Sequence, residues 1–260
     1  MIPALRRAPF VFLLAGLAGC SKPDATTPVE PHAELTAKLV SPIDVVLEWK
    51  GVPNAAGHAV EFATSPEGTY TNLDYVLAGK STFQHPNLVP ETHFYYRVRA
   101  FYGPTSSALD VPMPAPPPGE DIEKMDHSWT TPQTIASGSK APTHSIRGAS
   151  ASPDAAPTDF RAQVKHSSGI LFTWTDRAAD EDGYFLEVRP DGSTDFKVVA
   201  VLDANINSTG LRTLPNEKRA AYRVRAFYFG TASNVADKTT GPQPAQDAPA
   251  KPGGSAAPGS

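Results

Sequence analysis

The sequence predicts an all-β protein made of two β-sandwiches, and two local features carry this prediction. Apolar and polar residues alternate along short segments, which is the period of a strand with one buried face. In "DVVLEWK" at residues 44–50, for example, Val45, Leu47 and Trp49 share one side. Turn sequences such as residues 65–68, "SPEG", divide each half into about seven such segments, with hardly any helical periodicity.

A long internal repeat supports two sandwiches of the same kind. Residues 95–108, "YYRVRAFYGPTSSA", return as "AYRVRAFYFGTASN" at residues 221–234. The spacing also recurs, because 51 residues separate Trp49 from Ala100 and 52 separate Trp174 from Ala226. A shared spacing with a slip of one residue indicates a duplicated domain.

The second half resembles the fibronectin type III family in its bacterial extracellular form. The resemblance rests on "PTDFRA" at residues 157–162, Trp174 with Asp176, "EDGYFLEV" at 181–188, and the "YRVRAF" segment. The first half is a looser copy that keeps Gly57 and Glu61 at the positions of Gly183 and Glu187. The resemblance implies two immunoglobulin-like sandwiches whose main contact between sheets joins a tryptophan to the "YRVRAF" strand.

Alternation then predicts the core of each sandwich. The residues expected to face inward are Trp49, Tyr96 and Val98 in the first sandwich, and Trp174, Tyr222 and Val224 in the second. With no disulfide available, each sandwich is expected to close separately around its own tryptophan.

The N-terminus predicts an exported lipoprotein. Two arginines precede a short apolar stretch, and "LAGC" at residues 17–20 resembles the bacterial lipobox, in which Cys20 receives a diacylglycerol and becomes the first mature residue. Cys20 is also the only cysteine. The lipoprotein resemblance implies up to three acyl chains, palmitate among them, and hence a stable membrane anchor.

These features predict six segments along the 260-residue chain, in which 27 prolines indicate loose connections. In the linker, residues such as Trp129 could pack on a neighbour, but its length favours disorder. The expected segments are a signal peptide (1–19), a lipidated tether (20–31), domain 1 (32–111), a mostly disordered linker (112–156), domain 2 (157–240) and a disordered tail (241–260).

The sequence predicts no catalytic residue, no metal and no cofactor. Gly79-Lys80-Ser81 resembles the end of a phosphate-binding loop but lacks the earlier glycine. The acidic stretch 180–183 lacks the first and last ligands of a calcium loop, which leaves only a weak ion site of another kind as an alternative. The histidines form no metal-binding spacing.

The strand face opposite the core carries the remaining candidate site. Cross-strand ion pairs with Glu61 and Glu187 are the simpler interpretation, and a binding face of guanidinium and aromatic groups is the alternative. The residues of this possible binding face are Arg97, Arg99, Phe101, Arg223, Arg225 and Phe227.

The sequence therefore favours a non-enzymatic, lipid-anchored protein of the bacterial cell envelope that acts as a spacer, adhesion or protein-interaction module. A carbohydrate-recognition accessory to polysaccharide degradation is the alternative. We expect a membrane contact through the lipid and a protein or polysaccharide partner. Nucleic acid is not expected, because acidic residues outnumber basic ones by 27 to 23 and no basic stripe occurs. Ser21 after Cys20 favours the outer membrane.

Overall fold

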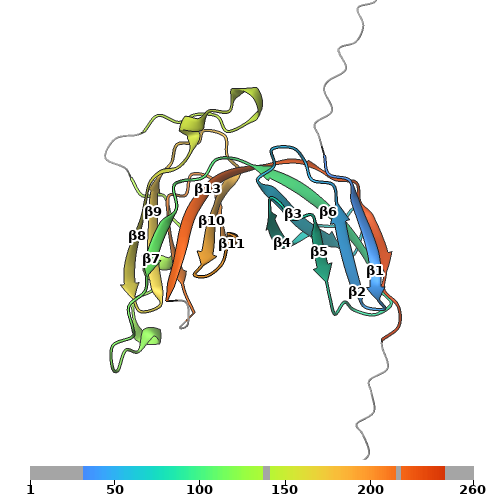
Figure 1. Cartoon of the computed structure of the whole chain (residues 1–260), viewed down its shortest axis with the longest axis horizontal. Coiled ribbons are helices and arrows are strands. Elements are labelled where there is room, and N and C mark those ends of the chain that lie inside the picture. Colours follow the sequence, from blue (N-terminus) through green and yellow to red (C-terminus); the bar gives the residue numbers. More distant parts are fainter. Residues whose placement is uncertain (1–31, 137–140, 215–217, 244–260) are drawn as a thin grey trace, which may run out of the picture.

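The computed structural model describes residues 32–136, 141–214 and 218–243, and these form two β-sandwiches arranged as an arch (Figure 1). In the first half, alternating segments form seven strands: β1 (Leu35–Ser41), β2 (Asp44–Trp49), β3 (Gly57–Ala63), β4 (Thr71–Leu77), β5 (Thr82–His85), β6 (His93–Tyr102) and β7 (Leu109–Pro112). The second half repeats the set with β8 (Thr158–His166), β9 (Gly169–Thr175), β10 (Gly183–Pro190), β11 (Lys197–Asp203), β12 (Ser208–Arg212), β13 (Arg219–Ala232) and β14 (Ala236–Thr239).

Each sandwich has a three-stranded sheet that packs on one half of a large shared sheet. The small sheets have the orders β1-β2-β5 and β12-β9-β8. The shared sheet has the order β11-β10-β13-β6-β3-β4, and β7 and β14 add to it beside β13 and β6. All the strand pairs are antiparallel, so each half has the fibronectin type III-like arrangement of three strands facing four.

The two sandwiches exchange their last strands. β7 follows β6 in the chain but pairs with β13, from Leu109 opposite Tyr222 to Pro112 opposite Arg219. In return, β14 follows β13 but pairs with β6, from Ala236 opposite Tyr96 to Thr239 opposite His93. In Figure 1, β13 can be followed as one ribbon from one half into the other.

This exchange corrects the expected domain boundaries. Residues 109–111, expected in domain 1, belong to the second sandwich, and residues 236–240, expected in domain 2, belong to the first. The sandwiches are therefore not separately closed. The physical reason is that β13 does not turn back after Phe227 but continues as a strand, with Tyr228 and Phe229 pairing with Tyr102 and Phe101 of β6.

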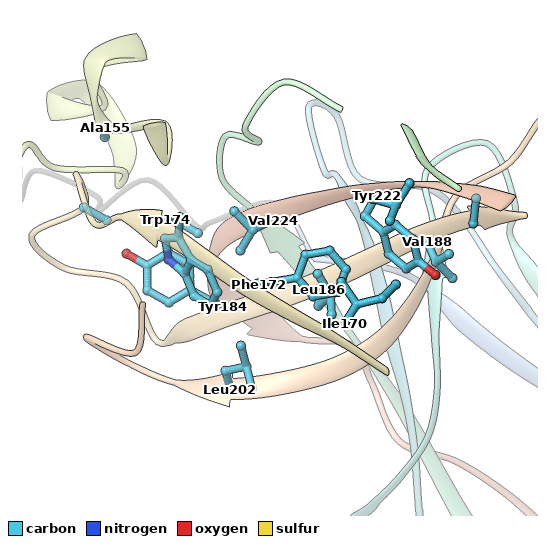
Figure 2. Close-up of a cluster of buried hydrophobic side chains, with 14 of the residues drawn as sticks. Ala155, Ile170, Phe172, Trp174, Tyr184, Leu186, Val188, Leu202, Tyr222 and Val224 are labelled. Atoms are coloured by element: carbon cyan, nitrogen blue, oxygen red, sulfur yellow. The ribbon is translucent and has the colours of Figure 1, made fainter. Parts of the chain in front are cut away.

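Two apolar clusters fill the sandwiches, and the predicted core residues lie in them. Trp49, Tyr96 and Val98 are buried in the first, while Trp174, Tyr222 and Val224 are buried in the second (Figure 2). The second cluster also takes in Val111 and Met113 from the first half of the chain. Burial of large apolar side chains contributes about 1.5–3 kcal/mol each, so the exchanged strands add to the core they join.

The linker is also different from the expectation of mostly disordered chain. Residues 113–136 and 141–156 run over the second sandwich and form four short 3-10 helices: Ile122–Lys124, Ser128–Thr130, Gly148–Ser150 and Pro153–Ala155. Trp129, Ile146 and Ala155 are buried. These apolar side chains find a surface on the sandwich, which offsets the entropy cost of ordering a long connection.

Candidate functional site: the junction and its groove

The crossing point between the sandwiches is held by two buried serines in equivalent positions. Ser106 exchanges hydrogen bonds with Val224, because its hydroxyl accepts from the Val224 N–H at 3.1 Å and its own N–H donates to the Val224 carbonyl at 2.8 Å. Ser233 does the same with Val98, at 3.0 and 2.8 Å. Each crossing segment is thus fastened to the central strand of the other sandwich.

A tight approach of the backbone also marks the crossing. Gly103 has a φ of +126°, and a Cβ there would lie 2.0 Å from the carbonyl oxygen of Ala226. The Gly103 carbonyl accepts a hydrogen bond of 2.7 Å from the Arg225 guanidinium. Only glycine allows this close contact.

Two buried carboxylates on the outer strand face each bind two guanidinium groups. Glu187 is fully buried and accepts from Arg223 Nε at 2.5 Å and from Arg225 Nε at 2.6 Å. Glu61 is bound by Arg97 and Arg99 in the same way, at 2.6 and 2.5 Å. The simpler interpretation of these residues, cross-strand ion pairs, describes this geometry.

The binding-face interpretation is wrong for the phenylalanines. Phe101 is fully buried and Phe227 is 2% exposed, because the outer faces of the two sandwiches meet at the junction. Phe185, which the alternation pattern did not single out, stacks on Phe227 with ring centroids 3.8 Å apart and contacts Phe101 at 5.0 Å. The three rings form a third apolar cluster, which we call the junction cluster.

Gly57 and Gly183, the repeated glycines, make room for this cluster. A Cβ at Gly57 would lie 2.4 Å from the Phe101 ring, and one at Gly183 would lie 3.2 Å from the Phe227 ring. Each glycine lies directly opposite the phenylalanine of its own sandwich, so it gives the ring room without showing that the other sandwich covers it.

Three of the four arginines, Arg97, Arg99 and Arg223, keep partly open surfaces, and each of these three stacks on an aromatic ring. The guanidinium of Arg97 lies 4.1 Å from the ring centroid of Tyr70, and that of Arg99 lies 4.1 Å from Phe229. Arg223 lies 4.0 Å from Phe196. Since Arg225 is only 10% exposed, the arginine available to a ligand in the second sandwich is Arg223.

A groove of about 830 Å³ lies between the facing edges of the two sandwiches. One wall comes from β4, β5 and the turn between them, and the other comes from residues 194–198 at the start of β11. Lys80 and Asp195 form an ion pair of 3.2 Å between the two walls. Asp74, Lys197 and Arg223 also line it, so the groove offers charges of both signs.

Gly79 and Lys80, which resemble the end of a phosphate-binding loop in sequence only, lie in the turn that lines this groove. The acidic stretch 180–183 has another role, because it fastens the linker. Asp180 accepts from the Ser145 hydroxyl at 2.6 Å and from the Ile146 N–H at 2.8 Å, and Asp182 pairs with Arg147 at 2.5 Å. These contacts occupy two carboxylates of the alternative ion site.

Metal-ligand clusters and titratable groups with shifted pKa values bear on what chemistry the described residues could perform. Within residues 32–136, 141–214 and 218–243, no group of three His, Cys, Asp or Glu side chains is placed to hold a metal ion. Burial lowers the pKa of His58 and of His85 and raises that of Glu181. None of these groups lines the groove.

The predicted lipidation site, Cys20, lies outside the described residues, as do the signal peptide and almost all of the tail. In the described ranges no helix has the length and apolar character needed to cross a bilayer.

The strand pairing and the junction define the chain as a pair of fibronectin type III-like sandwiches with exchanged last strands. No protein-family model and no curated protein matches the sequence. Among solved structures, a Fn3-like protein from Clostridium thermocellum is 26% identical, with 28% of this chain and 75% of that chain covered, at a TM-score of 0.25.

Two longer structures are also similar. The FN1–FN3 domains of chicken CNTN1 are 20% identical, with 80% of this chain and 65% of that chain covered, at a TM-score of 0.26. A segment of two fibronectin type III domains from chicken tenascin is 14% identical, with 79% and 95% covered, at 0.25. At such TM-scores, the class of this chain rests on its own strand pairing.

Proposed function

We propose that this chain is a non-enzymatic, lipid-anchored protein of the bacterial cell envelope that acts as a spacer, adhesion or protein-interaction module of fixed shape. The reciprocal strand exchange is the observation that supports it best. Two sandwiches on a flexible linker would move independently. Here a shared sheet, two fastened crossings and the junction cluster join them, so a partner meets both at a constant distance.

Fixed spacing can be measured with spin labels on the two small sheets, at the exposed positions Thr36 and Gln163. The proposal expects a single narrow distance distribution between labels in the Thr36→Cys/Gln163→Cys protein carrying Cys20→Ser. A broad distribution, as independent domains give, would contradict the spacer function.

The anchor is proposed from Cys20 and is tested separately. The mature protein should be found in the membrane fraction with an acylated N-terminal peptide, and Cys20→Ser should abolish both. In a Gram-negative host, we propose the outer membrane as its location. Ser21→Asp should then move the lipidated protein to the inner membrane, whereas an unchanged distribution would count against sorting by Ser21.

A second candidate function is carbohydrate recognition in support of a polysaccharide-degrading enzyme. The groove favours it, because ligand sites are concave and combine apolar walls with a few polar groups. Binding on a glycan array should be lost in Lys80→Ala/Lys197→Ala and kept in the control Lys38→Ala/Lys50→Ala, whose lysines lie outside the groove. Absence of glycan binding by the unaltered protein would leave the spacer function as the better account.

A further inference from the structure

The linker covers one edge of the second sandwich with a short segment, residues 126–136, which we call the edge strap. The strap pairs with β12, because Gln133 donates to the Ser208 carbonyl at 2.9 Å and accepts from the Ser208 N–H at 3.1 Å. The side-chain amide of Asn207 adds two hydrogen bonds to the Ile135 backbone, at 2.7 and 2.9 Å.

This cover is not a requirement of the fold. The equivalent strand of the first sandwich is β5, in which Thr82 lies opposite Glu48 as Ser208 lies opposite Thr173. Within the described ranges β5 pairs with β2 alone. One of two similar edges is therefore left open and the other is covered, which indicates that the cover has a function beyond stabilising the sandwich. An open strand edge is a template for another strand.

Trp129 anchors the strap in a slot that only glycines leave open. A Cβ at Gly210 would lie 2.5 Å from the Trp129 ring, and one at Gly169 would lie 2.7 Å from it. Trp129 is 9% exposed, and its indole N–H donates to the Asp126 carbonyl at 2.8 Å. The strap is held by this single large side chain and a few hydrogen bonds.

Two histidines contact the anchor. The His166 ring lies 5.5 Å from Trp129 and 5.6 Å from His127, measured between centroids. His166 is 8% exposed, and the Nε2 atoms of both histidines are buried without a hydrogen-bond partner in the described structure. Nδ1 of His166 accepts from the Ser168 N–H at 3.3 Å.

We propose that the edge strap is a pH-released cover of the β12 edge, and that protonation of His166, which lies beside Trp129 and His127, releases it. A second proton on His166 would go to Nδ1, where it would face the Ser168 N–H, a second donor. The cation would also lie beside His127 with its Nε2–H unpaired. A buried charge without a partner is costly, so protonation favours the released strap.

The charged groups around His166 determine whether its pKa is raised or lowered when the strap is bound. Burial and the nearby His127 lower the pKa of His166, Glu120 opposes them, and Arg212 acts with them. The other charged groups nearby are Lys165, on the same hairpin, and Asp126, in the strap. Arg212 is itself paired with Glu123 at 2.6 Å. The pKa of His166 is thus lower with the strap bound than with it released. The bound strap is favoured above about pH 6.5, the ordinary value, and is lost progressively below it.

The test follows the indole N–H signals of the three tryptophans of the full chain by NMR from pH 8 to pH 5. The Trp129 signal, assigned with Trp129→Phe, should move to a solvent-exposed position below about pH 6.5, while Trp174 stays unchanged as the control for an intact sandwich. The protection factor of the Ser208 amide, which is its intrinsic exchange rate at each pH divided by the observed rate, should fall at least tenfold over the same range. The ring signal of His166 should titrate with the same midpoint.

Two variants separate the histidines from general acid effects. His127→Gln/His166→Asn, in which the introduced amide oxygen could still accept from Ser168, should keep the strap bound down to pH 5. The matched control His144→Gln, in the same linker, should titrate like the unaltered protein. The proposal is overturned if Trp129 stays bound down to pH 5 in the unaltered chain, if Trp129 moves only together with Trp174, or if the His166 ring titrates at another midpoint.

Discussion

His93 in β6 and Asp237 in β14 share a hydrogen bond of 2.8 Å between Nε2 and a carboxylate oxygen, although they lie 144 positions apart in the chain. β14 is the last strand of the described part of the chain, and with this contact it closes the first sandwich. Its counterpart is the pairing of β7 with β13, which closes the second sandwich with a strand from the first half. Neither sandwich is complete without the other half of the chain, and this relationship determines how the protein should fold and break.

The first half should not fold by itself. Residues 32–112 contain β1–β7 but leave β6 without β14, and Val98 without its bond to Ser233. An unpaired edge and an open core should leave this fragment without cooperative unfolding by circular dichroism. A synthetic peptide of residues 230–243 should restore cooperative unfolding to the fragment in a dose-dependent way. A peptide of residues 105–113 should restore cooperative unfolding less. A fragment that is stable without peptide would contradict the exchange.

The two buried serines at the crossings should contribute equally to the free energy of unfolding. Ser106→Ala removes the acceptor of the buried Val224 N–H, and Ser233→Ala removes that of Val98. An unsatisfied buried N–H costs about 1–3 kcal/mol, so each variant should lower the free energy of unfolding by that amount in urea. Ser107→Ala, at an exposed neighbour, should change it by less than about 0.5 kcal/mol. Equal effects at Ser106 and Ser107 would argue against a fastened crossing.

Removing the charge of Glu187 should lower the free energy of unfolding more than removing the charge of Glu61. Glu187→Gln leaves Arg225, which is 10% exposed, without its anion, whereas Glu61→Gln leaves Arg97 and Arg99, which are about 30% exposed and can be hydrated. Breaking a buried pair costs about 3–5 kcal/mol, so Glu187→Gln should approach that range in denaturant unfolding. Glu61→Gln should cost clearly less, and the reverse order would show that exposure does not control these clusters.

The tryptophan core should couple both sandwiches. Trp174→Ala should cost about 3–5 kcal/mol. Because Val111 and Met113 of the first half pack in the same core, calorimetry should show one transition moved to lower temperature. Val201→Ala, at a side chain that is 48% exposed, should leave it in place. Two separate transitions, with only one displaced, would indicate independent domains.

The sequence indicated the sandwiches well because alternation is a local signal. Trp49 and Val98 could be placed in the core by period two alone, and the repeat carried the same reasoning to Trp174 and Val224. The exchange left no local signal. β7 and β14 have only four residues each, and both follow the same "YRVRAF" strand, so their local sequence does not say which sandwich each one joins.

The burial of Phe101 and Phe227 could not be predicted for the same reason, because no local signal in the sequence shows the exchange. Alternation correctly turned them away from their own cores, but an outer face is exposed only if nothing covers it. The other sandwich covers both residues, and that contact depends on the path of β13 beyond Phe227. The ion pairs of Glu61 and Glu187 were predictable, because they depend on register within one sandwich alone.

The most direct test of the account is disulfide formation between paired cysteines in a Cys20→Ser background. Asp110 lies opposite Ala221 in the exchanged ladder, and opposite residues are within the roughly 4.4–6.8 Å that a disulfide spans between Cα atoms. In separately closed sandwiches Asp110 would instead lie opposite Tyr95, which is equivalent to Ala221. The account predicts that Asp110→Cys/Ala221→Cys oxidises to a disulfide in the folded monomer and that Tyr95→Cys/Asp110→Cys does not. The opposite result would contradict it.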